Sequence, residues 1–171
     1  MPVARLNVPL ILLCACLSAC SDPGTSDEPD DEIQPDELSV TLGVPSGDDG
    51  LGFAPLDEGA VLKLQTFGQG GTHVLIAVRC TGCDNRAYVS AVMRNLTSGK
   101  EVSEPAPARP QLLYCTDDGN CDLVPYLVHA SGIAADEERD GLRVQLEAVV
   151  ESETGLAATG SREIVLSTAD L

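Results

Sequence analysis

Hydrophobic and polar residues alternate with a period of two over residues 142–150. One set of alternate positions is aliphatic, whereas the other is charged or polar except for Val149. Successive side chains of a β-strand point to opposite faces of its sheet, so this pattern predicts a strand that is buried on one face. Residues 73–80 place Val74, Ile76, Val78 and Cys80 on one face and a mixture of apolar and polar residues on the other. That mixed second face predicts a more central strand.

Seven segments have this character, and clusters of glycine, asparagine and aspartate separate them. They are residues 60–67, 73–80, 87–95, 111–115, 123–130, 142–150 and 157–166. Short strands at this spacing predict an all-β fold, an immunoglobulin-like β-sandwich of about seven strands within a domain over residues 38–171. A small β-barrel is the alternative that a strand count leaves open. Residues 134–140 could form one helical turn that crosses between the sheets.

The first 20 residues break the pattern and have the layout of an export signal. Arg5 is followed by an apolar run over residues 8–17 and then by small residues. A membrane span needs about 20 apolar residues, so the run is too short to be one. The alternative to a specialised signal is an ordinary one with chance cysteines, since Cys14 and Cys16 also lie in this region.

The residues Leu17-Ser18-Ala19-Cys20 resemble the lipobox of bacterial lipoproteins. The resemblance implies that residues 1–19 are a signal peptide that is removed and that lipid is attached to Cys20. Several acyl chains on one residue would anchor the protein stably, whereas a single chain binds only marginally. Under the sorting rules of Gram-negative bacteria, Ser21 favours the outer membrane, although Asp22 complicates that expectation.

Residues 20–37 are predicted to be the lipidated cysteine and a disordered acidic linker. Residues 21–37 hold eight acidic residues, three prolines, no basic residue and one aliphatic residue, Ile33. Such a segment cannot bury enough apolar surface to offset the entropy of ordering. Like charges and prolines keep it extended, so it is expected to act as a spacer.

The composition narrows the classes of partner and the make-up of the core. The chain has a formal charge of −17, and removing residues 1–19 leaves nine basic and 27 acidic side chains. This balance repels phosphate backbones and anionic lipid surfaces, so nucleic acid is excluded as a reasonable partner. Only five residues are aromatic, and none is tryptophan, so the core is predicted to consist mainly of valine, leucine, isoleucine and alanine.

Two further segments carry resemblances. Residues 140–160 resemble the final hairpin of immunoglobulin-like and fibronectin-like modules. The stretch Gly68-Gln69-Gly70-Gly71-Thr72-His73-Val74, after Leu56-Asp57-Glu58-Gly59, resembles a segment of uncharacterised lipoproteins from myxobacteria. These resemblances imply a fold and a location, and they offer no catalytic residues.

Four cysteines follow the linker, namely Cys80, Cys83, Cys115 and Cys121. An even number in an exported protein predicts two disulfides. The local pairing of Cys80 with Cys83 and of Cys115 with Cys121 is favoured, because each pair flanks a glycine-containing turn, and cross-pairing is the rival. Cys80-Thr81-Gly82-Cys83 also matches a redox motif, but that motif opens a helix, and here strands flank it. A four-cysteine zinc site is disfavoured by the oxidising compartment.

The remaining candidate sites have weak signals. His73 and His129, the only histidines, would both be needed for a copper or zinc site, together with a residue such as Met93. Both lie at strand ends, which favours a structural role. Ser98-Gly99-Lys100 lacks the upstream glycine of a phosphate-binding loop, and the usual hydrolase motifs are missing.

The loop over residues 116–122 is the best candidate for a ligand site. Asp117, Asp118, Asn120 and Asp122 supply oxygens of the kind that Ca²⁺ prefers. The loop lacks the spacing of an EF-hand, and an acidic turn inside a disulfide loop is the favoured interpretation.

Together these patterns predict a lipid-anchored lipoprotein of the cell envelope, in the outer membrane of a Gram-negative bacterium. Its β-sandwich is expected to be non-catalytic, to need no cofactor and to serve structural purposes or interactions with an envelope protein. The alternative is a ligand-binding module for calcium or carbohydrate that acts through the loops at one end. The lack of tryptophan argues against the stacking platform of many sugar-binding proteins.

Overall fold

A computed structural model describes residues 37–66, 71–104, 107–133 and 139–169, which lie within one compact unit, Ile33–Leu171. The predicted signal peptide, Cys20 and nearly all of the acidic linker lie outside the described residues, as does most of the segment 134–140. The strands are β1 (Ser39–Ser46), β2 (Gly52–Pro55), β3 (Ala60–Lys63), β4 (Gln65–Thr66), β5 (Thr72–Thr81), β6 (Arg86–Asn95), β7 (Arg109–Leu112), β8 (Tyr114–Cys115), β9 (Asn120–His129), β10 (Arg143–Ser152) and β11 (Ala157–Ser167).

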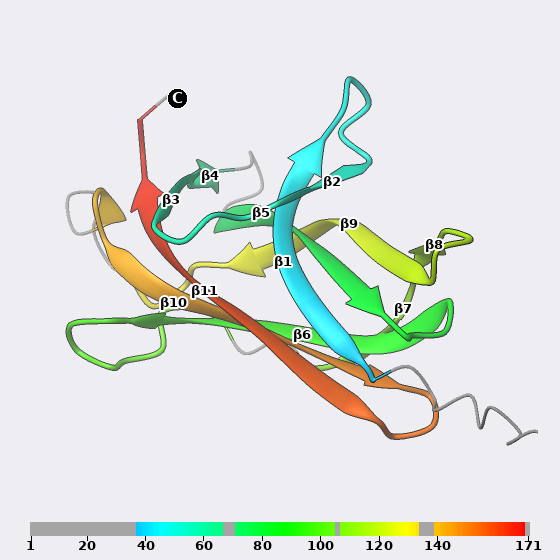
Figure 1. The fold of residues 1–171 in the computed structure, drawn as a ribbon. Coiled ribbons are helices and arrows are strands. Elements are labelled where there is room, and N and C mark those ends of the chain that lie inside the picture. Colours follow the sequence, from blue (N-terminus) through cyan, green and yellow to red (C-terminus); the bar gives the residue numbers. More distant parts are fainter. Residues whose placement is uncertain (1–36, 67–70, 105–106, 134–138, 170–171) are drawn as a thin grey trace, which may run out of the picture. The chain divides into compact units, whose positions relative to one another are not determined.

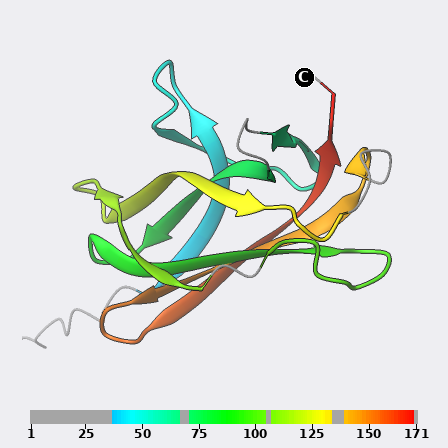
Figure 2. The same cartoon turned by 180° about the vertical axis from the view of Figure 1, so that it is seen from behind.

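These strands form two sheets, so the all-β prediction is confirmed (Figure 1). The first sheet has the order β2-β1-β5-β9-β8, with β4 also paired to β5. The second has the order β3-β11-β10-β6-β7. All neighbours are antiparallel except β3 and β11, which run parallel. The view from behind shows β6, β10 and β11 as one layer beneath β5 and β9 (Figure 2).

One hydrophobic core lies between the sheets, and it is built almost wholly from aliphatic side chains. Residues from both sheets contribute, including Val74 and Ile76 of β5 and Val144, Leu146 and Ile164 of the opposite sheet. On β10 the buried positions alternate with less buried ones, as the period of two predicts. On β5 the second face is also partly covered, and the strand lies between β1 and β9, as expected of a central strand.

Each of the seven predicted segments contains a strand, and two of them contain a pair. Residues 60–67 divide into β3 and β4, which belong to different sheets, and buried Leu64 lies between them. Residues 111–115 likewise span the end of β7 and all of β8, with buried Leu113 between them. Strands β1 and β2 were not predicted, and they bring the described total to eleven.

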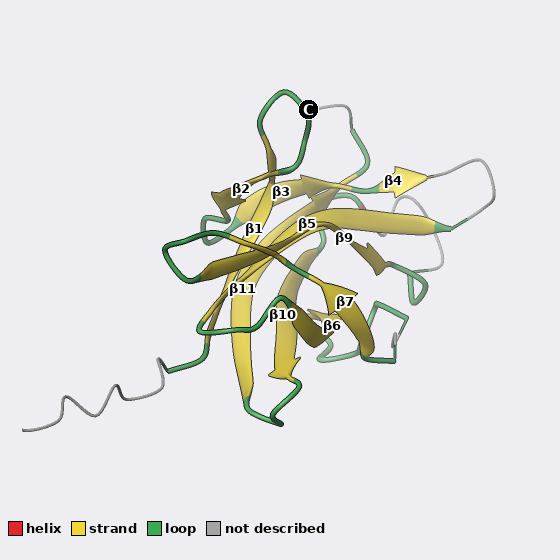
Figure 3. Ribbon diagram, turned by 90° about the vertical axis from the view of Figure 1, so that its right-hand side faces the viewer, coloured by secondary structure: helices red, strands yellow, loops and turns green. Residues whose placement is uncertain are grey.

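Strand β1 packs closely on its neighbour β2 and on β11 of the opposite sheet because glycines make room at both contacts. At Gly43 a Cβ atom would lie 2.4 Å from the ring of Phe53, which folds across the strand from β2. At Gly160 on β11 a Cβ atom would lie 2.7 Å from the carbonyl oxygen of Val40. The side view shows β1 running close to β11 (Figure 3).

Candidate functional site

A groove runs along one lateral edge of the domain. It has a volume of about 500 Å³ and lies between β9 of one sheet and β7 of the other. Val89, Leu123 and Tyr126 give it apolar walls, and the Tyr126 hydroxyl donates a hydrogen bond of 3.3 Å to the Val89 carbonyl oxygen across the sheets. We call this feature the edge groove. Its volume falls in the range of ordinary ligand sites.

The edge groove exists because β9 is paired along only part of its outer side. β8 pairs with β9 at Cys121 and Asp122 and then ends. At the other end, the backbone N–H of Glu104 donates a hydrogen bond of 3.0 Å to the His129 carbonyl oxygen. Among the described residues, no strand covers the outer side of β9 between these two points. The chain thus frames an open length of strand edge.

Exposed apolar side chains lie on the three strands that border this edge, and one of them, Leu127, lines the groove. Leu112 on β7, Tyr114 on β8 and Leu127 on β9 are 60%, 68% and 44% exposed. Other exposed leucines of the described chain lie singly at turns, as Leu51 and Leu156 do. Single apolar residues on a surface are ordinary, whereas an exposed apolar side chain that lines a groove, as Leu127 does, is typical of an interaction site.

Two charged side chains of opposite sign line the edge groove. Glu104 lies beside His129 at one end, and Arg109 begins β7 on the opposite wall. Neither has an ion-pair partner among the described residues, in contrast to Arg79, whose guanidinium donates two hydrogen bonds of 2.7 and 2.8 Å to Asp122. Arg79 also lies 4.2 Å from the centre of the Phe53 ring. The charges of the groove are therefore available to a ligand.

The structure brings the two histidines together but leaves Met93 on a different layer. His73 and His129 are directly opposite each other on β5 and β9, with ring centres 5.7 Å apart. His73 lies on the face of β5 opposite to core residues Val74 and Ile76, whereas Met93 lies fully buried on β6. The predicted combination of two histidines with Met93 is therefore not assembled. Within the described residues, no three histidine, cysteine, aspartate or glutamate side chains are grouped to hold a metal ion.

His73 links the stability of the domain to pH. Burial, and to a smaller extent neighbouring His129, lowers the pKa of His73 below its ordinary value. In the unfolded chain the imidazole titrates at about 6.5, so the unfolded state binds the proton first as the pH falls. The contribution of His73 to the free energy of unfolding is therefore complete above about pH 6.5 and is lost progressively below it.

We expect His73→Gln to flatten the fall in stability between about pH 7.5 and 5.5, a window above the titration of ordinary carboxylates. The measurement is the urea midpoint as a function of pH. His129→Gln is the matched variant, and it should keep most of the fall because burial is the larger cause of the lowered pKa. Equal slopes for wild type and His73→Gln would show that His73 is not the titrating group.

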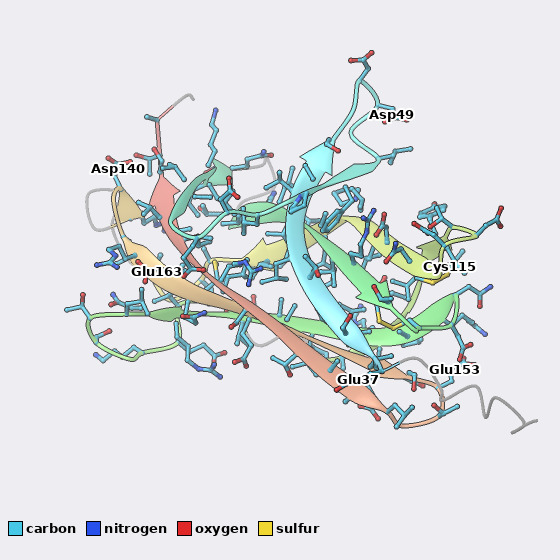
Figure 4. The ribbon with its side chains drawn as sticks, in the orientation of Figure 1. Glu37, Asp49, Cys115, Asp140, Glu153 and Glu163 are labelled. Carbon is cyan, nitrogen blue, oxygen red and sulfur yellow. A yellow bond between two sulfur atoms is a disulfide. The ribbon has the colours of Figure 1, made fainter. Side chains whose placement is uncertain are left out.

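The four cysteines form two disulfides in neighbouring turns at one end of the domain. Cys80 pairs with Cys83 and Cys115 with Cys121, with Cα atoms 5.7 Å and 3.9 Å apart. Figure 4 shows Cys115 at the turn between β8 and β9. This is the local pairing that the sequence favoured over cross-pairing. The segment Cys80–Cys83 joins the end of β5 to the turn before β6, so it lacks the helix of a redox site.

The two disulfide turns also contact each other. The Gly82 N–H donates a hydrogen bond of 3.3 Å to the Gly119 carbonyl oxygen. The hydroxyl of Thr81 donates to the Asn120 side-chain oxygen at 2.8 Å. Cys80 and Cys121 are directly opposite on β5 and β9, and both are buried. The disulfides thus belong to one cluster at the end of the core.

The candidate calcium ligands are engaged with the protein itself. Asp118 accepts hydrogen bonds from the Thr116 hydroxyl and from the Asn120 side chain, and these bonds lower the pKa of its carboxyl group. Asp122 lies on β9 and binds Arg79. Asp117 is exposed at the turn. The arrangement around Asp118 is the side-chain bonding expected of a tight acidic turn.

Sequence reasoning missed the residues of the edge groove. Their positions depend on where β8 ends and where Glu104 meets β9, and neither is visible in a local pattern. The only sequence signals are Pro110 and Pro125, since proline within a sheet is largely confined to edge strands and bulges.

No protein-family model matches the chain, and no curated protein matches it in sequence. The described residues include no helix that is long and apolar enough to cross a membrane.

Proposed function

We propose that this chain is a lipid-anchored envelope lipoprotein whose immunoglobulin-like domain presents a non-catalytic surface for protein interaction. The anchor is Cys20, and the location is the outer membrane of a Gram-negative bacterium. The observation that carries the interaction role is the edge groove, which exposed Leu127 lines beside an open strand edge, with Leu112 and Tyr114 exposed on the bordering strands β7 and β8. Apolar surface of this kind marks contact sites for partners.

The strand order supports an immunoglobulin-like connectivity. In such domains strands A, B, E and D form one sheet, and strands C, F and G form the other. Here β1, β5, β9 and β8 follow the first order, and β6, β10 and β11 follow the second. The domain departs from antibody domains because it lacks tryptophan and its two disulfides lie within turns.

Two features support export and anchoring. The motif Leu17-Ser18-Ala19-Cys20 has the residue types of a lipobox. Disulfides persist in oxidising compartments outside the cytosol, and the domain contains two. The described chain enters the domain at Glu37, and β1 then passes Gly160 close to the β10–β11 turn (Figure 4). That end of the domain is the one nearest to the anchor in sequence.

The proposal is tested in the envelope of the native host with a photo-crosslinking amino acid at Leu112. We expect adducts with an envelope protein, and we expect few from the same amino acid at Leu156, which is equally exposed but lies at the β10–β11 turn. Cys20→Ser should release the protein from the membrane fraction, and intact mass should show acyl chains on Cys20 in the parent protein only.

The two halves of the proposal fail separately. An unmodified mature N-terminus at a position other than Cys20 would contradict the anchor. Cys16→Ser, the matched control within the signal segment, should change neither mass nor fractionation. Equal adducts at Leu112 and Leu156 would contradict the interaction role of the edge.

A further inference from the structure

We infer that the open edge of β9 binds a short extended segment of a basic partner protein, which adds to the sheet as one more strand. The inference rests on the proposed interaction role and names the partner's chemistry. Strand addition is a general mode of peptide recognition in which backbone hydrogen bonds supply affinity and pockets for alternate side chains supply specificity.

The backbone orientation of β9 leaves hydrogen-bonding groups exposed at this edge. The Ala130 N–H donates to the Thr72 carbonyl oxygen at 2.8 Å, so Ala130 faces β5. Backbone groups alternate in direction along a strand, so Val128 also faces β5, whereas Leu127 and His129 face outward. The His129 carbonyl oxygen already accepts the hydrogen bond from the Glu104 N–H. The N–H and C=O of Leu127 and the N–H of His129 therefore have no strand partner within the described chain.

The bound segment must be short. The register of β5 against β9 shifts between Ile76 and Val78, which places a bulge at Val124 and Pro125 of β9. Pro125 has no N–H to donate, and Glu104 closes the other end. Bulges and prolines are devices that stop edge strands from pairing with each other without limit. The edge is therefore suited to a few residues of one partner and disfavours unlimited strand addition.

The groove selects the pattern of side chains in that segment. Residues of an added strand that lie beside Tyr126 and Val128 point toward the interior, where Val89 and Leu123 form apolar walls. Residues that lie beside Leu127 point to the outer face. The fitting segment therefore alternates aliphatic side chains, directed inward, with polar side chains directed outward.

Charge selects a basic segment. The chain carries 27 acidic and ten basic residues, so an acidic partner is repelled and a second copy of the same chain is repelled as well. The edge groove itself carries one charge of each sign. Glu104 at its end, which has no ion-pair partner among the described residues, can bind a lysine or arginine, and Arg109 on the opposite wall favours an uncharged side chain beside it. The preference for a basic segment therefore comes from Glu104 and from the net charge of the chain. Complementary charge acts mainly on the rate of association and on specificity.

The probe is a synthetic peptide of alternating valine and lysine, six residues long and capped at both ends. We expect it to bind the mature chain carrying Cys20→Ser, with amide shifts in ¹⁵N NMR spectra centred on Leu127 and His129. The same peptide with N-methylated alternate amides should bind at least tenfold more weakly, because it cannot complete the ladder. A valine–glutamate peptide should bind at least tenfold more weakly because of charge.

Leu127→Pro is the matching change in the protein. It removes an N–H that does not face β5, and we expect it to weaken the peptide at least tenfold. Leu112→Pro is the control for folding: Leu112 lies two residues after Pro110 on edge strand β7, so its N–H also faces away from β6, and the same kind of change should leave that sheet intact. Amide spectra establish that each variant is folded, and the N-methylated peptide tests the inference even if Leu127→Pro does not fold.

Shifts centred elsewhere, or equal binding of the N-methylated or the acidic peptide, would overturn the inference. So would a dimer in sedimentation that Leu127→Pro abolishes, because the occupant would then be a second copy. Adducts at Leu112 in the envelope without binding of the valine–lysine peptide would leave the interaction role standing and reject the basic strand. Peptide binding without adducts at Leu112 would support the basic strand and contradict the interaction role in the envelope.

Discussion

Gly160→Val is expected to lower the free energy of unfolding by about 2–3 kcal/mol, because no space exists for a side chain beneath β1. A Cβ atom at this position would lie 2.7 Å from the Val40 carbonyl oxygen and 2.9 Å from the Val40 Cγ1. The nearest atom belongs to the backbone, so relief requires movement of the whole strand. Valine favours β-structure, so intrinsic propensity alone predicts the opposite sign.

Urea unfolding measures the effect, and Thr159→Val is the matched control. Thr159 is exposed on the opposite face of the same strand, so the same new side chain should change stability by less than about 0.5 kcal/mol. Gly160→Ala should fall between the two, because a single methyl group already meets the Val40 oxygen. A Gly160→Val protein as stable as wild type would mean that β1 does not pack on β11.

This close approach is also the reason that β1 escaped sequence reasoning. Val40, Leu42 and Val44 do alternate, but Gly43 and Pro45 interrupt the segment with residues that are usually depleted in strands. Gly43 is required there because the Phe53 ring occupies the space of its Cβ atom. The requirement is a contact between two strands, and no local pattern expresses it.

The two divided segments show a second limit. Residues 60–67 contain no turn residue, and Leu62 and Leu64 alternate with Lys63 and Gln65, so periodicity indicates one strand, yet β3 and β4 belong to different sheets. The change of sheet occurs at buried Leu64, whose N–H donates to the Ser167 carbonyl oxygen at 2.8 Å. Local hydrophobicity records that a residue is buried, and it does not record which sheet pairs with it.

The candidate site also has one part that the sequence predicts and one part that it does not. The pairing of the cysteines was predictable because each pair is close in sequence and flanks a turn, so local geometry decides it. The edge groove was not predictable because it requires β7, β8, β9 and Glu104 to meet from distant parts of the chain. Chemistry carried by adjacent residues is visible in a sequence, whereas an unpaired edge appears only after pairing is known.

Loss of both disulfides is expected to cost about 4 kcal/mol in total while leaving the sandwich folded. On the chain-entropy model each short loop contributes about 2 kcal/mol. The best variants are Cys83→Ser and Cys115→Ser, which replace the less buried partner of each pair. The buried positions 80 and 121 then keep a free thiol, which is less costly to bury than a serine hydroxyl. Each variant leaves a small apolar thiol in the core and removes only the cross-link.

Urea unfolding of the single and double variants, with and without reductant, separates the cross-links from other effects. The free energy of unfolding of reduced wild type should match that of the double variant. Adding reductant to the double variant should not change its stability. The Gly82–Gly119 and Thr81–Asn120 hydrogen bonds join the two turns, so the two disulfides are expected to be energetically coupled. The stability lost in the double variant should therefore differ from the sum of the losses in the two single variants by about 0.5 kcal/mol or more. Peptide mapping that finds a disulfide from Cys80 or Cys83 to Cys115 or Cys121 would contradict the local pairing. Complete unfolding of the double variant would show that the disulfides hold the two sheets together as well as closing two turns.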